Sequence, residues 1–387
     1  MSSHPQPVPE SAPAAAGTTY AAAGVDTAAG DRAVELMRAS VAATMTPAVV
    51  GEVGGFAGLV DVSALRDYRR PLLATSTDGV GTKVAIAQAL GVHDTIGQDL
   101  VGMVVDDIVV VGARPLLMTD YIACGRVVPE RIADIVRGVA TACAAVGTPL
   151  LGGETAEHPG LMEADEYDLA GAATGVVEAD RVLGPERVRP GDVLIALASS
   201  GLHSNGYSLV RRVIADAGWG LERQVPELGR TLGEELLEPT RLYTKACLAM
   251  IGALGSEAAP SPIHALSHVT GGGLAANLAR VLPAGTIADV DRSGWVIPPV
   301  FDLVRHLGSV PWEDLEGTLN LGVGMVAVVA PDSAEAVLRV AQGSEMSAWV
   351  LGGVHEAQAY EPQGRVVAGT KGVDGGAVDV FGRYRTA

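Results

Sequence analysis

The sequence predicts an α/β protein of two domains with mixed sheets. Strand-like apolar runs alternate with helical stretches, a turn-rich segment at 180–192 interrupts the alternation once, and the alternation then resumes. A length of 387 residues suits about two domains of roughly 150 residues each. We therefore predict an extension at 1–23, domains at 24–178 and 179–360, and a C-terminal tail at 361–387.

Apolar patterning predicts the elements of each domain. Ile96, Leu100, Val104 and Ile108 recur at helical spacing, so one stripe of their helix faces a core. In the first domain we expect strands at 72–76, 116–121, 149–152 and 167–177, and helices at 94–111 and 129–146. In the second we expect strands at 193–198, 263–269 and 323–330, and helices at 204–217, 240–254 and 333–341.

The two ends of the chain lack core-forming patterns. Residues 1–23 consist mainly of Ala, Pro and Ser, too few large apolar groups to offset the entropy of ordering, so we expect a disordered extension. The stretch after about residue 361 is rich in glycine, and we expect it to be loose.

Composition excludes several classes of partner. Forty-five acidic residues against 27 basic ones leave a net charge of −18, which argues against nucleic acid or an anionic membrane as a partner. Three widely spaced cysteines indicate a reducing compartment, and neither a signal peptide nor a long apolar run is present, so we expect the cytoplasm.

Several common motifs fail by spacing. The run at 77–83 lacks the spacing of a P-loop, and Leu at position 202 breaks the pattern around a nucleophilic serine. The run at 271–276 satisfies G-x-G-x-x-A, a weak dinucleotide signal in a chain with 49 glycines. His264 and His268 lack a zinc pattern, and we interpret them as structural.

Two carboxylates next to glycine turns are candidates for a hard cation. Asp78 precedes Gly79 and Glu154 follows Gly153, each after a predicted strand, where α/β folds place ligand groups. A turn-stabilising carboxylate explains each of them equally well. The chain has 24 Arg but three Lys, so Lys83 within a glycine turn indicates selection for a compact charge.

Together, eight motifs resemble those of the phosphoribosylformylglycinamidine cyclo-ligase family, also called aminoimidazole ribonucleotide synthetases. The runs are GVD at 24–26, GGF at 54–56, STDGVGTK at 76–83, HDTIGQDL at 93–100, GGETAE at 152–157, HSNGYS at 203–208, TGGG at 270–273 and NLGVGM at 320–325. The resemblance implies two α/β domains and a homodimer whose first domains pair into a barrel-like core. It also implies that ATP phosphorylates the formamide oxygen of formylglycinamidine ribonucleotide, after which an internal nitrogen displaces phosphate and closes the imidazole ring.

The resemblance also implies roles for particular residues, with ATP and Mg²⁺ as cofactors and a K⁺ requirement left open. The implied catalytic residues are Asp78, Lys83, His203 and Asn205, and the implied metal ligands are Asp78, Asp106 and Glu154. The implied nucleotide-binding residues are Gly79, Gly81, Thr82, Lys83, Asp107, Gly152 and Gly153. The implied substrate-binding residues are Gly54, Gly55, Ser204, Asn205, Gly271 and Gly272. One departure is that the family usually has Asn-Asp where this chain has Asp106-Asp107, which puts the role of Asp106 in doubt.

Three other hypotheses remain at this point. A relative such as thiamine-monophosphate kinase, selenophosphate synthetase or the hydrogenase-maturation dehydratase shares ATP-binding carboxylates, but not the HSNGYS, TGGG and NLGVGM runs together. A non-catalytic nucleotide-binding module is disfavoured by carboxylates kept in three separate turns. A dehydrogenase rests on the glycine run at 271–276 alone.

Overall fold

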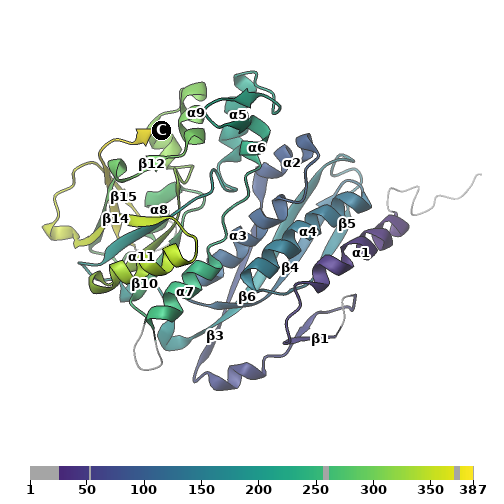
Figure 1. Ribbon diagram of the computed structural model, residues 1–387, viewed down its shortest axis with the longest axis horizontal. Coiled ribbons are helices and arrows are strands. Elements are labelled where there is room, and N and C mark those ends of the chain that lie inside the picture. The colour runs from purple at the N-terminus through teal and green to yellow at the C-terminus, as the bar shows by residue number, and fades with distance from the viewer. Residues whose placement is uncertain (1–25, 52–53, 256–260, 370–374, 387) are drawn as a thin grey trace, which may run out of the picture.

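The computed structural model describes residues 26–51, 54–255, 261–369 and 375–386, and Figure 1 shows the two large sheets among the elements that they form. The predicted extension at 1–23 and the first two residues of the GVD motif lie outside the described residues. None of the helices in these described ranges combines the length and apolarity needed to cross a membrane.

The first half of the chain forms a mixed four-stranded sheet. Its strands lie in the order β3-β6-β4-β5, and only β4 and β5 are parallel. Their bounds are β3 (Pro71–Gly79), β4 (Arg114–Cys124), β5 (Leu150–Glu157) and β6 (Tyr167–Glu178). The predicted mixed sheet is confirmed, and each of the four predicted strands overlaps one of these.

Helices cover one face of this sheet. The α3 helix (Ile96–Val109) packs on β3, β4 and β6, α4 (Pro129–Val146) packs on α3, and α1 (Thr27–Ala42) lies along α4. A Cβ atom at Gly97 would lie 2.1 Å from the main-chain nitrogen of Val139, so glycine is what allows α3 and α4 to approach so closely. No described helix covers the opposite face, and Leu73 and Tyr121 of this sheet are 66% and 41% exposed.

The second half forms a seven-stranded sheet with helices on both faces. The order is β10-β13-β7-β14-β11-β16-β15. Along β7, Ile195 and Leu197 join the core beneath α7 and α11, whereas Leu194 and Ala196 belong to the core on the other face. A strand buried on both faces has a continuous apolar run, which is the pattern at 193–198.

The bounds of the second-half elements are as follows. The strands are β7 (Val193–Ala198), β10 (Ile263–His268), β11 (Thr286–Asp291), β13 (Val323–Val329), β14 (Ala348–Glu356), β15 (Arg365–Ala368) and β16 (Ala377–Phe381). The helices are α5 (Tyr207–Asp216), α6 (Leu232–Leu236), α7 (Thr244–Leu254), α8 (Gly273–Ala279), α9 (Pro299–Gly308), α10 (Trp312–Glu316) and α11 (Ala334–Gly343). Short elements complete the fold: α2 (Val84–Leu90) and the strand pairs β1 (Val49–Val50) with β2 (Leu59–Val60), β8 (Gln224–Val225) with β9 (Arg230–Thr231), and β12 (Val296–Ile297) with β17 (Arg385–Thr386).

The prediction of a loose C-terminal stretch is wrong for its described residues. Strand β16 lies between β11 and β15 inside the seven-stranded sheet, and Val378 and Val380 are buried there. The Asp379 side chain is buried between them and accepts hydrogen bonds from the main-chain nitrogens of Gln363 and Gly364. The many glycines of this stretch flank the strands. The short apolar patterns of β15 and β16 were therefore not recognised in the sequence. The apolar patterning also did not predict α1, α9, β11 and β14, or the shorter helices α6 and α10.

Candidate active site

Three of the predicted glycine turns meet where the two halves of the chain join. The Ser204 hydroxyl donates a hydrogen bond to the Val80 carbonyl oxygen at 2.7 Å, and the Thr82 and Ser208 hydroxyls lie 3.3 Å apart. A Cβ atom at Gly271 would lie 3.3 Å from Asn205 Oδ1. The structure therefore brings together residues 78–83, 203–206 and 271–273, which we call the domain junction together with Asp107 and His268.

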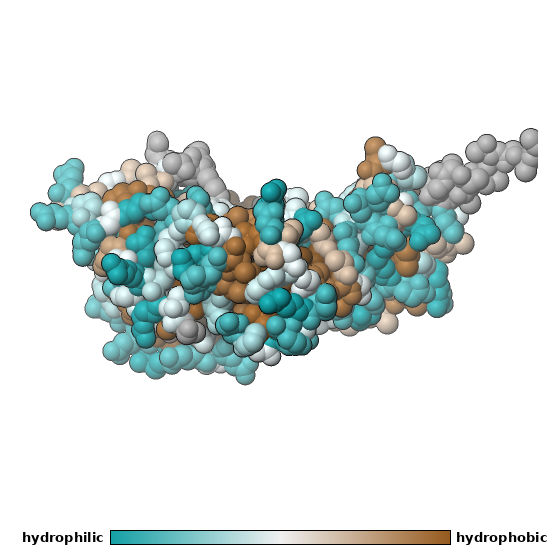
Figure 2. Space-filling view, turned by 90° about the horizontal axis from the view of Figure 1, so that it is seen from above, coloured by the Kyte–Doolittle hydropathy of each residue, from teal (hydrophilic) through white to brown (hydrophobic). Residues whose placement is uncertain are grey.

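One face of the molecule shows how surface polarity varies along its long axis. Seen from above, hydrophobic surface gathers in the central part and hydrophilic surface lies towards both ends (Figure 2). The central part is where the two halves meet in Figure 1.

Two carboxylates and a histidine form the acidic part of the junction. The side chain of His268, at the end of β10, is 3% exposed and pairs through Nδ1 with Asp107 Oδ1 of α3 at 2.9 Å. Burial lowers the pKa of His268, but the hydrogen bond to Asp107 and the nearby carboxylates outweigh it, so the pKa is raised. Asp78 lies at the end of β3. Its partial burial raises the pKa of its carboxyl group, and the negative charge of Asp107 raises it further. The hydrogen bond between His268 and Asp107 agrees with the interpretation of His268 as a hydrogen-bonded histidine, although the sequence did not indicate its partner.

Asp106 does not fit the predicted role of a metal ligand. It is fully buried, and its oxygens accept hydrogen bonds from the Tyr243 main-chain nitrogen at 3.0 and 3.1 Å and from the Thr244 hydroxyl at 2.7 Å. These donors lie at the start of α7, so Asp106 caps a helix of the other half of the chain. Burial raises the pKa of Asp106 to about 6.

Lys83 does not fit the predicted role of a phosphate ligand. Its side chain is 0% exposed, and Nζ donates to Asp99 Oδ1 at 2.8 Å and to the Glu238 carbonyl oxygen at 2.6 Å. The turn at 81–83 directs this ammonium inwards, where it balances a carboxylate that also accepts from Thr240. The compact charge is therefore used inside the protein.

His203 is also enclosed. It is 2% exposed and has a positive φ of 62°, and its Nε2 accepts a hydrogen bond from the Ser200 main-chain nitrogen at 3.2 Å. Burial, with a further contribution from nearby cations, lowers its pKa well below the ordinary value, so the ring is neutral. This geometry favours a role in shaping the 203–206 turn over direct proton transfer.

The other predicted glycines line a separate cavity of about 660 Å³ between α1, β5 and the loop at 54–58. Its walls include five predicted residues, Gly54, Gly55, Gly152, Gly153 and Glu154. Its volume is typical of ligand sites, which span roughly 300–1,000 Å³. We call it the glycine cavity.

The sequence analysis missed Asp120 in the glycine cavity. Its Oδ2 atom is enclosed and has no hydrogen-bond partner in the part of the chain that the structure describes, and burial raises the pKa of Asp120 to about 7. Its Oδ1 lies where a Cβ atom of Gly153 would be, 1.5 Å from the ideal position. Glycine at 153 therefore makes room for this carboxyl group, and only the pairing of β4 with β5 reveals it.

Within one chain, the junction and the glycine cavity are separated. Glu154 pairs with Tyr121, Tyr121 with Ala170, and Ala170 with Gly79, so Glu154 lies three strands from the 78–83 turn, about 14 Å at ~4.8 Å per strand. Among the described residues, no group of three or more His, Cys, Asp or Glu side chains has the arrangement of a metal site. The predicted set of Asp78, Asp106 and Glu154 does not come together in one chain.

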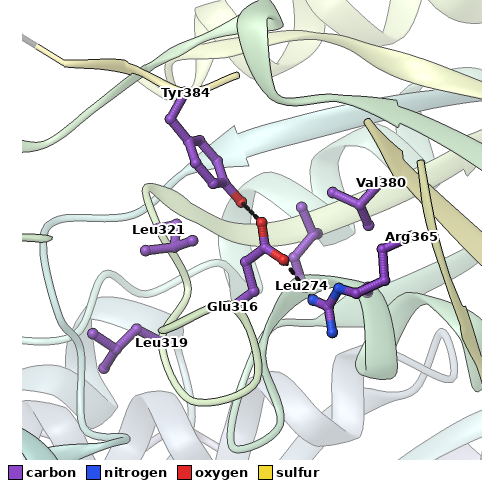
Figure 3. Close-up of a pocket in the computed structure, with 8 residues that line it drawn as sticks. Leu274, Glu316, Leu319, Leu321, Arg365, Val380 and Tyr384 are labelled. Atoms are coloured by element: carbon purple, nitrogen blue, oxygen red, sulfur yellow. Dashed lines mark hydrogen bonds and ion pairs between the residues drawn. The ribbon is translucent and has the colours of Figure 1, made fainter. Parts of the chain in front are cut away.

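A buried charge cluster links the C-terminal strands to the second half of the junction. Glu316 accepts hydrogen bonds from Arg292 Nε at 2.5 Å, from Arg365 Nη2 at 2.5 Å and from the Tyr384 hydroxyl at 3.0 Å. Figure 3 shows Tyr384 and Arg365 approaching this carboxylate from two sides. Three strong partners lower the pKa of Glu316 in spite of its burial.

The dehydrogenase hypothesis does not fit the topology. The glycine run at 271–276 follows β10, an edge strand that pairs only with β13 and is antiparallel to it. A dinucleotide-binding turn follows a parallel strand inside a sheet.

Comparison with known proteins identifies the class of this fold and site. Residues 60–177 match the model of the AIR synthase related protein, N-terminal domain, and residues 189–365 match that of the AIR synthase related protein, C-terminal domain. The chain therefore belongs to the AIR synthase related family.

Individual relatives narrow the assignment. The chain is 47% identical over 338 residues to a phosphoribosylformylglycinamidine cyclo-ligase of Geobacillus thermodenitrificans, covering 87% of this chain and 95% of the relative. It is 47% identical over 335 residues to the enzyme of that name in Anaeromyxobacter, covering 86% and 95%. The resemblance seen in the motifs is confirmed: within the family, the chain is one of the phosphoribosylformylglycinamidine cyclo-ligases, ATP-dependent ligases of purine biosynthesis.

More distant structures share the fold. Thiamine-monophosphate kinase from Stenotrophomonas maltophilia superposes with a TM-score of 0.61 at 18% identity, covering 91% of this chain and 96% of the kinase. Hydrogenase maturation protein HypE in complex with ATP superposes with a TM-score of 0.57 at 20% identity, covering 84% and 86%. These likenesses establish the two-domain fold.

Proposed function

We propose that this chain uses ATP to close the imidazole ring of formylglycinamidine ribonucleotide, forming 5-aminoimidazole ribonucleotide, ADP and phosphate. The observation that carries the proposal is the meeting of the 78–83, 203–206 and 271–273 turns at the domain junction. The reaction is the one for which the relatives at 47% identity are named, that of a phosphoribosylformylglycinamidine cyclo-ligase. We propose that the enzyme works in the cytoplasm, as the sequence predicts.

The domain junction offers main-chain groups and a side-chain amide to which the ribonucleotide can bind. We propose that Ser204, Asn205, Gly271 and Gly272 hold it, because these turns bring main-chain groups and the Asn205 amide close together in the junction. Asp78 and Asp107 are the exposed carboxylates there, and we propose that they meet Mg²⁺ bound to ATP. Gly79, Gly81 and Thr82 lie beside them, where phosphate oxygens need close approach.

His268 lies beside this site and is held by Asp107. Asp107 holds its Nδ1, and the charges of Asp78, Asp106 and Asp107 favour the imidazolium form. We propose that this cation offsets charge that develops on the transferred phosphoryl group, the principal electrostatic demand of such a reaction.

We further propose that the protein is a homodimer formed through the uncovered face of the four-stranded sheet. That face carries no described helix and exposes Leu73 and Tyr121. Phosphoryl transfer requires reacting groups in contact, whereas in one chain Glu154 of the glycine cavity lies about 14 Å from the 78–83 turn, and Asp120 lies two strands from Asp78, about 10 Å. A partner chain that brings its glycine cavity to the junction would complete the site.

The decisive experiment incubates the full chain with ATP, Mg²⁺ and formylglycinamidine ribonucleotide and follows ADP and the aminoimidazole product together. Equal amounts of both products, and no ADP without the ribonucleotide, are the expected result. ADP release with thiamine monophosphate in its place would overturn the proposal. Light scattering of the parent and of Tyr121→Arg tests the dimer, because a buried arginine at the sheet face would favour monomers.

A further inference from the structure

A short segment of the second half contacts both substrate-binding turns. Residues 316–320, which we call the bridge segment, run from the last residue of α10 into the loop before β13. A Cβ atom at Gly273 would lie 1.7 Å from the Glu316 carbonyl oxygen, and a Cβ atom at Gly206 would lie 2.4 Å from Leu319 Cδ2. Glycine at both positions lets the turns rest directly against the bridge segment.

The far end of the bridge segment is also fastened to a turn. The Asn320 side chain donates hydrogen bonds to the carbonyl oxygens of Gly201 and Leu202 at 2.9 and 3.2 Å, and its Oδ1 accepts from the Gly322 main-chain nitrogen. A shift of the bridge segment would therefore move the 201–206 and 271–273 turns together.

The near end is held by the C-terminal strands. Glu316 is 6% exposed on its side chain, and its partners are Arg292 after β11, Arg365 at the start of β15 and Tyr384 after β16. The matched family model ends at residue 365, so β16 and Tyr384 lie beyond the matched region. Truncating one partner of a buried, hydrogen-bonded charge is costly, so these contacts fix Glu316 strongly.

The cluster serves structure and not ligand binding. The cavity lined by Glu316, Arg365, Tyr384 and neighbouring apolar residues (Figure 3) has a volume of about 10 Å³. That volume is roughly the space of one water molecule. No substrate fits there, so an effect of these residues on catalysis must pass through the bridge segment.

We propose that the C-terminal strands position the substrate-binding turns: through Arg365 and Tyr384 they fix Glu316, and the bridge segment then sets the turns at 201–206 and 271–273 for the ribonucleotide. The inference rests on the proposed function, which assigns the ribonucleotide to those turns. Tyr384, Arg365 and Glu316 are positioning residues, because none of them lines the junction itself.

The chain offers a matched pair of variants as the test. The Tyr384 hydroxyl donates to Glu316 at 3.0 Å, and the Tyr360 hydroxyl donates to Asp379 at the same distance. Tyr384→Phe and Tyr360→Phe thus each remove one hydroxyl-to-carboxylate hydrogen bond of the same length, but only the first touches the bridge segment. We expect Tyr384→Phe to raise KM for formylglycinamidine ribonucleotide at least ~fivefold while KM for ATP changes by less than about twofold. Tyr360→Phe should change neither constant.

A second readout does not depend on activity. Amide hydrogen exchange at 201–206 and 271–273 should be faster in Tyr384→Phe than in Tyr360→Phe, measured well below both melting temperatures. Arg365→Lys, which keeps the charge but loses the planar geometry, should act in the same direction. Equal exchange and equal KM values in the two tyrosine variants would overturn the inference. If the parent enzyme fails to convert the ribonucleotide, the proposed function falls, while the exchange result still decides whether the bridge segment is coupled to the turns.

Discussion

Buried carboxyl groups lie both beside the domain junction and in the glycine cavity, but the two regions give them different partners. Beside the junction, Asp99 is paired with Lys83, and Asp106 accepts hydrogen bonds from the start of α7. In the glycine cavity, Asp120 Oδ2 has no hydrogen-bond partner among the described residues. Asp99 Oδ2 and His268 Nε2 are likewise buried without a described partner, so the contrast lies in the ion pair and the capping bonds that Asp99 and Asp106 have.

The largest effect, a loss of stability, is expected at Lys83, a fully buried residue of the junction. Lys83→Met would leave the Asp99 carboxylate buried and unpaired, which costs about 3–5 kcal/mol. We expect urea unfolding to show that loss of stability, with the activity of the surviving folded fraction nearly unchanged. The exposed pair of Arg212 and Asp216 supplies the control, because Arg212→Met should cost less than about 1 kcal/mol. A normal unfolding curve combined with weakened ATP binding would instead restore Lys83 as a phosphate ligand.

The second prediction concerns Asp107 at the domain junction, where turnover and stability are expected to change independently. Asp107 is 42% exposed on its side chain and holds His268, so Asp107→Asn should keep the fold but lower turnover by roughly 10²-fold. Steady-state kinetics and thermal melting of Asp107→Asn measure the two quantities. Asp180→Asn, which changes an exposed carboxylate near Arg69, should leave turnover unchanged. A turnover of Asp107→Asn within twofold of the parent would remove the acidic pair from the reaction.

The sequence predicted most of the long elements of the fold, but not the contacts that some of the predicted site residues make, for a physical reason. Periodicity reports burial, so α4 and β7 were predicted to the residue, and the motifs located every turn of the junction. Motif letters do not report the direction of a side chain. Lys83 and Asp106 were assigned to ligands because they lie in or near glycine-rich runs, yet both point into contacts that form only when the second half of the chain packs on the first.

The functional residues that were not predicted from the sequence were missed for the same reason. Asp120 and Glu316 are neither in a motif nor at a strand end beside a glycine turn that their own segment forms. Their environments come from pairing across strands: β4 with β5 for Asp120, and the C-terminal strands with the end of α10 for Glu316. Such groups become visible only after the sheet order is known.

A smaller effect is expected in the glycine cavity, and it depends on pH. The pKa of Asp120 is raised to about 7, against about 3.9 for an unfolded aspartate. Between these values the folded state binds the additional proton, so Asp120 makes stability fall as pH rises from about 4 to about 7. Asp120→Asn should flatten that part of the stability curve and leave the protein more stable at pH 8. Urea unfolding of both proteins at pH 5 and pH 8 gives the comparison, and parallel curves would show that Asp120 is ionised and satisfied.

The smallest effect is expected for Asp106→Asn, which restores the residue that the family usually has. The amide oxygen can still accept from the Tyr243 nitrogen and the Thr244 hydroxyl, so the cap of α7 is kept and stability at pH 8 should change by less than about 1 kcal/mol. What changes is the charge beside His268. Asp106 contributes to the raised pKa of that histidine, so the substitution should move its titration to lower pH without abolishing turnover. NMR titration of His268, with the exposed His306 as internal reference, measures the shift. A loss of turnover of several orders of magnitude with the fold intact would show that the Asp106 carboxylate leaves the α7 cap during the reaction and binds a ligand at the junction after all.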